Sequence, residues 1–286
     1  GYPGSTSNSN SIGLAIQTST FYFFQNNTSG SQKFVSFNGN TNTYTTLANS
    51  PISGSDVRGC VTADGTGYYC LDASGTLCYY NIAGNTWVKI GSNIVNQFGT
   101  NLASTFSNLN TGDMAIDGLG KLWIVASNSS NWGLYMLNAP LPTTAQATIT
   151  LKQEVAPTQP TPGGTFFAGI AYNATGQIYL STLNDLYLLN NNLTITHVGA
   201  FSVAGVGSDL TSCNYPFSVL PVNLTNFTAT NQANSVLLNW MVTSSEDLNL
   251  FEVERSTNNG IDWNSIGLVM GPEDNFNEQH YLFKVL

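Results

Sequence analysis

The segment Asp64-Gly-Thr-Gly-Tyr-Tyr69 joins a turn to an aromatic strand, and the chain repeats this arrangement twice. The later copies are Asp117-Gly-Leu-Gly-Lys-Leu-Trp123 and Asn173-Ala-Thr-Gly-Gln-Ile-Tyr179, at offsets of 53 and 56 residues. Asp, Asn and Gly tolerate a positive φ at low cost, and aromatic residues fit strands packed between sheets. The repeat therefore predicts tight turns at Asp64, Asp117 and Asn173, where a recurring acid is a structural turn residue rather than a catalytic one.

A second repeat places an Asn-rich turn between two apolar strands. Phe37–Leu47 matches Tyr80–Ile90 at an offset of 43 residues, which is about the length of one propeller blade. With an N-terminal unit built from 12–16, 21–24 and 33–37, four blade-like units lie between about residues 11 and 219. The pattern predicts an all-β fold, a β-propeller with four or five visible blades that either closes or is the visible part of a larger wheel.

Composition narrows the classes of function. The 286 residues are 42% hydrophobic and only 8% charged, with a net charge of −9. The Lys and Arg residues are scattered singly, whereas nucleic-acid binding needs them clustered, so no nucleic acid is expected. Nor does any apolar run reach the roughly 20 residues of a membrane-spanning helix. A surface of neutral polar groups indicates an extracellular or outer cell-surface location.

The proportion of acidic to basic residues differs between two parts of the chain. Residues 1–219 carry 5 basic and 8 acidic side chains, whereas residues 220–286 carry 2 basic and 8 acidic ones. In the second part, 236–240 and 251–255 alternate apolar and polar residues, as half-buried strands do. Two domains are therefore predicted: a propeller-like domain over 1–219 and a small β-sandwich with an acidic outer face over 220–286.

Several segments resemble known families. The Asp117–Trp123 turn resembles the blade signature of regulator-type and lyase-type propellers, and Asn85-Thr-Trp87 is similar to the end of a kelch repeat. Residues 220–286, with Val236–Trp240 and Phe251–Thr257, resemble the fibronectin type III-like module that precedes the sorting domain in Bacteroidetes proteins exported by the type IX system. The resemblance implies a fibronectin/Ig-like sandwich, here without its sorting domain, and an exported surface protein.

Candidate catalytic groups are sparse. The two histidines, His197 and His280, fall in different predicted domains, and His197 lies in an alternating strand that favours a structural or surface role. No Cys or His pair has the spacing of zinc ligands. The sequence therefore predicts no catalytic residue, no metal and no cofactor. Two facing carboxylates or a Tyr–His pair at the propeller axis would instead indicate a polysaccharide lyase or hydrolase.

Two structural features involve polar and sulfur-containing residues. The segment Ser256-Thr-Asn258-Asn-Gly260-Ile-Asp-Trp263 is similar to the Asp-box of secreted β proteins, a hairpin turn that bonds its own backbone over a packed Trp. Among the four cysteines, Cys70 and Cys78 flank a predicted hairpin and allow a cross-strand disulfide. Cys60 and Cys213 allow a second one, while free buried thiols are the alternative for each.

Aromatic residues are the remaining candidates for ligand binding. Trp132 lies in the polar segment 127–133, where a loop tryptophan has no obvious core to enter, and Tyr135 and Trp123 are its aromatic neighbours. The sequence thus favours a non-catalytic binding or adhesion protein whose propeller loops contact a glycan or a surface protein. A self-associating subunit of a surface fibre or layer is the second hypothesis, and the lyase or hydrolase is the third.

Overall fold

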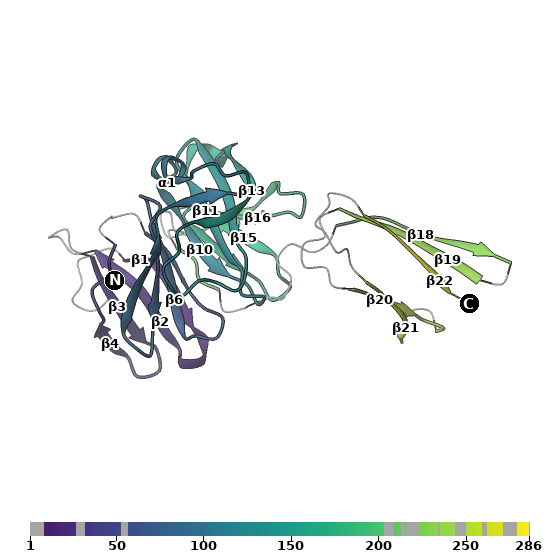
Figure 1. Cartoon of the computed structure of the whole chain (residues 1–286), viewed down its shortest axis with the longest axis horizontal. Helices are drawn as coiled ribbons and strands as arrows, with labels where there is room; N and C mark the ends of the chain where they lie inside the picture. The colour runs from purple at the N-terminus through teal and green to yellow at the C-terminus, as the bar shows by residue number, and fades with distance from the viewer. Residues whose placement is uncertain are drawn as a thin grey trace. The chain divides into compact units, whose positions relative to one another are not determined.

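A computed structural model describes residues 9–26, 32–52, 57–202, 209–212, 215, 223–233, 235–243, 250–258, 262–270 and 279–285 (Figure 1). The chain divides into two compact units, Gly1–Val219 and Leu220–Leu286. This boundary coincides with the change in charge along the sequence. Each unit is described separately below.

In its described residues the first unit contains four sheets, each with four antiparallel strands in chain order, and the third sheet has a fifth, parallel strand at its edge. Sheet one contains β1 (Ser9–Ala15), β2 (Thr20–Asn26), β3 (Gln32–Asn38) and β4 (Thr43–Thr46). Sheet two contains β5 (Val57–Val61), β6 (Gly67–Asp72), β7 (Leu77–Asn81) and β8 (Thr86–Gly91). Sheet three contains β10 (Thr111–Ile116), β11 (Leu122–Ser127), β12 (Asn131–Leu137) and β13 (Ile149–Pro160), and β9 (Ile94–Asn96) joins β13 in parallel. Sheet four contains β14 (Gly169–Tyr172), β15 (Ile178–Ser181), β16 (Asp185–Leu189) and β17 (Ile195–Ala200). The short helices are η1 (Ile16–Thr18), α1 (Ala103–Asn108) and η2 (Pro162–Gly164).

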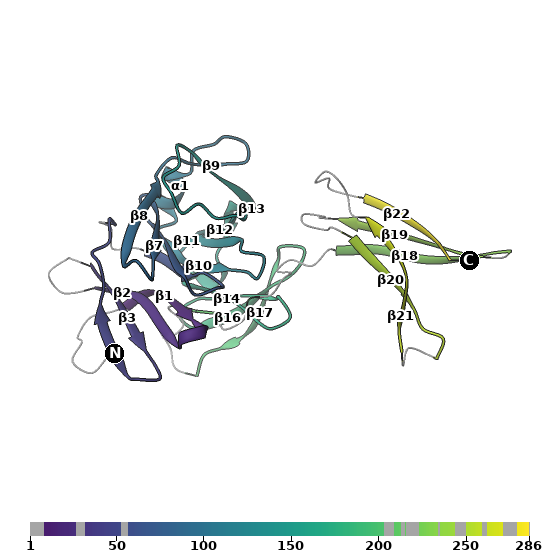
Figure 2. The same ribbon diagram turned by 60° about the horizontal axis from the view of Figure 1, so that its bottom comes forward.

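The first strands of the four sheets are neighbours. β1 contacts β5, β5 contacts β10 and β10 contacts β14. Figure 2 shows β1, β10 and β14 near one another. The segment Asp209–Ser212 adjoins both ends of this series, because Ile12 N–H on β1 donates to Asp209 at 2.8 Å and Tyr172 N–H on β14 donates to Ser212 Oγ at 2.9 Å. We call β1, β5, β10, β14 and Asp209–Ser212 the inner ring. The predicted propeller of four-stranded blades is confirmed.

Aromatic side chains pack the first two blades together. Phe34 on β3 is 1% exposed. Its ring centroid lies 4.9 Å from those of Tyr68 and Tyr80 and 4.8 Å from that of Trp87, all three on the second blade. A second apolar cluster lies between blades two and three and includes Leu71, Phe106 and Tyr135. The apolar core of the first unit therefore lies between neighbouring blades. The packing of this core fixes the positions of the turns at the ends of the blade strands.

The repeated turn residues act as hydrogen-bond acceptors. Asp64 Oδ1 accepts from Thr66 N–H at 3.1 Å. Asp117 Oδ1 accepts from the N–H groups of residues 119 and 121, and Asn173 Oδ1 from those of residues 175 and 177. These carboxylate and amide oxygens accept from backbone N–H groups of the turn that have no partner in a neighbouring strand, as in an Asx turn. In blades two, three and four, these side chains therefore bond to the backbone of the turn between the first and second strands.

Replacing Asp117 by alanine is expected to lower the free energy of unfolding by about 2–4 kcal/mol. Asp117 is 1% exposed, and its Oδ2 accepts from Trp123 Nε1 at 3.0 Å. The substitution would leave this buried indole N–H without an acceptor. Asp64→Ala, at the equivalent but exposed turn, is the matched control and should cost below about 1 kcal/mol. Urea denaturation measures both, and equal losses would contradict the assignment.

The second unit has two sheets. One contains β18 (Asn223–Gln232), β19 (Ser235–Thr243) and β22 (Gln279–Val285), and the other contains β20 (Leu250–Arg255) and β21 (Asn264–Met270). Trp240, Val242 and Tyr281 form the buried cluster between them, together with Phe251 and other partly buried residues. A Cβ atom on Gly267 of β21 would lie 2.2 Å from the Phe283 ring on β22, so the sheets approach closely there. In neither unit does the described chain contain a helix that is long and apolar enough to cross a membrane.

Candidate functional site

The three aromatic residues predicted to bind ligand are buried. Trp123 and Trp132 are each 3% exposed and Tyr135 is fully buried. Trp132 packs edge-on against Phe167 at 5.2 Å, and Tyr135 packs against Phe106 at 5.3 Å. The prediction that these residues contact ligand is therefore wrong, because their rings fill the space between and within blades.

The prediction for Trp132 failed because the polar segment before it was interpreted as a long loop. Asn128 makes a tight turn instead, accepting from the N–H groups of Ser130 and Asn131 at 2.8 Å each. β12 then begins at Asn131, so Trp132 already lies in a strand, opposite Gln159. The continuous apolar run Leu134–Leu137, which follows the turn at Asn128, is the sequence signal for this strand.

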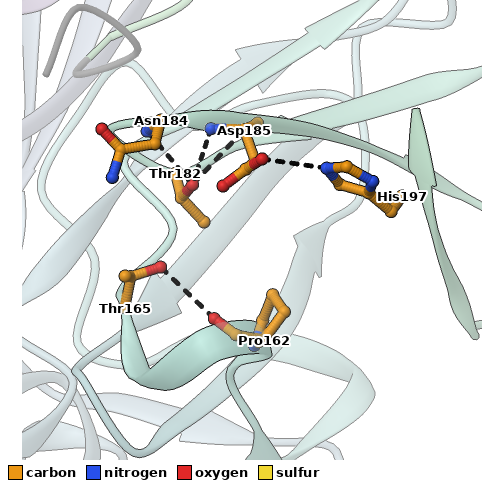
Figure 3. Close-up of polar contacts among 6 residues, drawn as sticks. All are labelled: Pro162, Thr165, Thr182, Asn184, Asp185 and His197. Atoms are coloured by element: carbon orange, nitrogen blue, oxygen red, sulfur yellow. Dashed lines mark hydrogen bonds and ion pairs between the residues drawn. The ribbon is translucent and has the colours of Figure 1, made fainter. Parts of the chain in front are cut away.

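A histidine and a carboxylate meet on the outer strands of the fourth blade. His197 Nε2 on β17 lies 2.9 Å from Asp185 Oδ1 on β16 (Figure 3). The two side chains are 54% and 31% exposed, respectively. The Thr182 hydroxyl, drawn beside the pair, accepts from the N–H groups of Asn184 and Asp185. His197 also has Tyr187 beside it, with ring centroids 5.2 Å apart. The structure thus places a His–Tyr pair at the outer edge of a blade, away from the inner ring.

Two carboxyl groups do meet in the inner ring. Asp113 on β10 and Asp209 lie within hydrogen-bonding reach of one another. Asp113 is 1% exposed, and its oxygens accept from the N–H groups of Met114 and Ile170 at 2.7 and 3.0 Å. The cavity beside Cys60, Met114 and Ser212 measures about 10 Å³, which leaves room for at most one water molecule. A glycosidase needs its carboxyl groups about 5–10 Å apart with a sugar between them, so this pair does not fit that chemistry.

The Asp-box-like turn forms hydrogen bonds among its own residues. Asn258 Oδ1 accepts from Ser256 Oγ at 2.9 Å and from Asp262 N–H at 2.9 Å. Asn258 Nδ2 donates to Asp262 Oδ2 at 2.7 Å. Gly260 lies outside the described residues. Trp263 is 58% exposed, and packing of its ring under the turn stays a prediction because residues 259–261 lie outside the described residues.

The described cysteines are buried free thiols. Cys70 and Cys78 lie opposite one another on β6 and β7, and their thiols are hydrogen-bonded to each other rather than joined. Burial raises the pKa values of the Cys60 and Cys70 thiols well above the ordinary range, so both stay protonated. Cys213, the predicted partner of Cys60, lies outside the described residues. The structure thus has the free-thiol alternative at Cys60, Cys70 and Cys78.

The second unit contains an open groove between its two sheets. Its volume is about 400 Å³, within the range of small-ligand sites. The lining residues are Phe227, Leu238, Trp240, Phe251, Glu252, Val253, Glu254 and Trp263. The groove is continuous with the apolar interior of the unit, since four of these residues also belong to the buried cluster or pack against it.

Aromatic rings of differing exposure line this groove. Trp240 is 3% exposed and forms its floor, with Phe251 packed edge-on at 5.3 Å and Phe227 at 6.5 Å. Phe227 and Trp263 are 56% and 58% exposed and border it. The Trp240 Nε1–H donor is buried and has no acceptor among the described residues. A ligand oxygen that accepted a hydrogen bond from this N–H would remove the free-energy cost of burying the donor without a partner.

The groove lies in the most acidic part of the chain. Glu252 and Glu254 contribute to its lining, and residues 220–286 carry 8 acidic and 2 basic side chains. Aromatic faces attract cations, and neighbouring carboxylates add to that attraction. The arrangement suits a ligand with an apolar body, a positive charge and a hydrogen-bond acceptor. In the described ranges, no group of three or more His, Cys, Asp or Glu residues could hold a metal ion.

Comparison with known proteins supplies no relative with a shared sequence. No protein-family model matches this chain, and no curated protein is similar to it. Among solved structures, a protein proposed to be a gluconolactonase is similar with a TM-score of 0.43 and 11% identity, over 82% of this chain and 74% of that chain. A Bacteroides thetaiotaomicron protein of unknown function gives a TM-score of 0.43 and 14% identity, over 96% of this chain and 64% of that one. The β-propeller domain of Cps50 (Swd1) from Myceliophteria thermophila gives 0.38 and 9%, over 93% and 72%. At these values no activity is transferred from these proteins.

Proposed function

We propose that this chain is a non-catalytic binding protein that holds a cationic segment of a partner protein in the groove of its second unit. The observation that carries the proposal is the groove itself, where exposed Trp263 and Phe227 flank an unsatisfied Trp240 N–H donor. A peptide provides all three features that this site suits: a main-chain carbonyl acceptor, an apolar side chain, and a Lys or Arg cation. A neutral glycan provides the acceptor and an apolar face, but leaves the acidic lining without a counter-charge.

The hydrogen bonds made by the ionisable groups of the propeller support a binding role rather than a catalytic one. Asp113 accepts from the backbone N–H of Ile170 and Asp209 accepts from that of Ile12, so both carboxyl groups take part in holding the inner ring together. The exposed His197 is paired with Asp185 at a blade edge, where the Thr182 hydroxyl is bonded to backbone groups. In this proposal the propeller is a rigid scaffold.

The proposed place of action is the extracellular or outer cell surface. The low content of charged residues, 8%, gives a surface of neutral polar groups, and the resemblance of residues 220–286 to the module of type IX-exported proteins points the same way. Self-association into a surface fibre is the alternative. Light scattering of the purified chain distinguishes the two, because a monomer is expected for a binding protein and a high-order assembly for a fibre subunit.

We expect Trp263→Ala to weaken binding to cationic peptides about tenfold, because the variant loses one wall of the aromatic site. The probes are short peptides on an array, in which each Lys or Arg is replaced in turn by glutamate or norleucine, beside an array of neutral glycans. Calorimetry then measures the affinity of the best peptide, which should fall in the variant and fall again with added salt. Mass spectrometry should recover the peptide uncleaved.

Phe98→Ala is the matched control for this experiment. Phe98 is 78% exposed at a turn of the first unit and does not line the groove, so its loss removes an exposed aromatic ring from outside the proposed site. Its affinity should equal that of the unmodified chain. If Trp263→Ala lowered only the melting temperature and left binding unchanged, the groove would be an incompletely filled core and the proposal would be wrong. Binding of neutral glycans alone would instead establish the glycan alternative.

A further inference from the structure

The inner ring holds two carboxyl groups in contact away from solvent. Asp113 and Asp209 come from segments nearly one hundred residues apart in the chain and lie within hydrogen-bonding reach. Asp209 Oδ1 is buried and has no hydrogen-bond donor among the described residues. Two ionised carboxylates cannot share such a site, because their charges repel and neither is solvated.

The other three carboxyl oxygens of the pair accept from backbone N–H groups in three parts of the inner ring. Asp113 Oδ2 accepts from Ile170 N–H on β14 at 3.0 Å, and its Oδ1 accepts from Met114 N–H on β10 at 2.7 Å. Asp209 Oδ2 accepts from Ile12 N–H on β1 at 2.8 Å. The pair therefore connects the first blade, the third blade and the fourth blade through main-chain groups. The inner ring closes at this position.

We propose that Asp113 and Asp209 share one proton and that this proton locks the inner ring closed. An O–H from one carboxyl to the other supplies the missing partner of Asp209 Oδ1. The one remaining negative charge is stabilised by the backbone N–H donors from β1, β10 and β14. Loss of the proton places two charges in contact, and separating them requires the segment Asp209–Ser212 to move away from β10.

The surroundings favour the protonated form. Burial, above all, raises the pKa of both carboxyls, and the neighbouring Asp209 raises that of Asp113 further. The pKa of Asp209 is raised to about 7. The other titratable groups that face the pair are Tyr68 from β6, Cys60 from β5 and Tyr172 from β14, and burial raises the pKa of each well above its usual range. These three groups are neutral in the working range of the pair.

One cation lies on the adjacent β5 strand. Arg58 directs its Nη2 to the carbonyl oxygens of Leu109 and Thr111, at the beginning of β10. Its guanidinium also lies 5.6 Å from the centre of the Phe106 ring. Arg58 is thus engaged with α1 and the start of β10.

The sign of the pH dependence follows from the raised pKa. The folded chain binds the proton more tightly than the unfolded chain, in which an aspartate titrates near 4. The stabilisation is therefore fully present below about pH 4 and is lost as the pH rises through about 7. The closed ring is most stable in mildly acidic solution.

The test compares melting temperatures near pH 5 and pH 8.5 for the full chain and for Asp209→Asn. We expect the unmodified chain to melt about 5–10 °C lower at the higher pH. The substituted side chain is neutral, and its amide can donate to Asp113, so the variant should lose most of this difference and melt above the unmodified chain near pH 8.5. Asp64→Asn, at an exposed turn where the amide keeps the Oδ1 acceptor for Thr66 N–H, is the matched control and should keep the unmodified profile.

Hydrogen exchange locates the effect. Protection factors of the amides in β1 and β14 should fall as the pH rises through about 7, while those in β7 should not. Asp113→Asn, which leaves the other carboxyl in place, is a second neutral variant if Asp209→Asn does not fold. A melting temperature that rises with pH in the unmodified chain, or a full pH dependence retained in either variant, would overturn the proposal.

Discussion

Replacing Phe34 by alanine is expected to lower the free energy of unfolding by about 3–5 kcal/mol, the range typical of a buried phenylalanine. Phe34 is 1% exposed, and its ring packs at 4.8–5.0 Å from the rings of Phe24, Tyr80 and Trp87. These partners come from both of the first two blades, so the cavity left behind would lie in the contact between them. The surrounding rings are large and rigid, and they cannot collapse into the space without losing their own packing.

The measurement is guanidinium denaturation followed by near-ultraviolet circular dichroism, which reports the packing of the aromatic rings. Phe98→Ala removes the same number of atoms from a side chain that is 78% exposed, so it should stay within about 0.5 kcal/mol of the unmodified chain. A loss below about 1 kcal/mol for Phe34→Ala would mean that the first two blades are not packed through this cluster.

Gly112→Ala is expected to prevent folding or to cost more than about 3 kcal/mol. Gly112 has φ +137°, and a Cβ atom there would lie 2.0 Å from the carbonyl oxygen of Val125 on the paired strand β11. That oxygen belongs to the backbone of a buried sheet and cannot rotate away. The residue also precedes Asp113, so a shift of β10 would disturb the carboxyl pair.

Gly163→Ala separates backbone strain from collision. Gly163 also has a positive φ, +64°, but a Cβ atom there would meet nothing within 4 Å. Its cost should therefore be limited to about 1–2 kcal/mol of left-handed strain. Comparison of soluble yield and melting temperature for the two variants checks the argument. Equal effects would show that the close approach of β10 and β11 does not restrict residue 112.

The architecture of the first unit was predictable because it depends on local patterns. The turn signals at Asp64, Asp117 and Asn173 and the aromatic strands after them lie within a few residues of one another. A short window of sequence is therefore enough to predict the turn and the strand after it in the blades that carry this signal. The charge distribution likewise marked the division at residue 219. Both signals are properties of composition and spacing and need no knowledge of the tertiary contacts.

The candidate sites depend on contacts that no local pattern contains. Trp132 was expected at the surface because polar residues precede it, and Tyr135 was a candidate as its aromatic neighbour. Phe167 packs against Trp132 and Phe106 packs against Tyr135, from distant parts of the chain. Asp113 and Asp209 carry no motif, and only the closed ring brings them together. The groove of the second unit was missed for the same reason, since the alternation that identifies Trp240 and Phe251 as strand residues does not show that one end of the space between the sheets stays open.

The joining of Ile12 to Asp209 constrains how the protein is made. The two residues are 197 positions apart, and Tyr215 reaches back over 201 positions to the carbonyl of Leu14. During synthesis from the N-terminus, the first three blades can form from contacts within and between neighbours, but β1 lacks its final partner until nearly the whole unit has been translated. Closure is thus a late step, and a nascent chain stalled before residue 209 would present an unfinished first strand to chaperones and proteases.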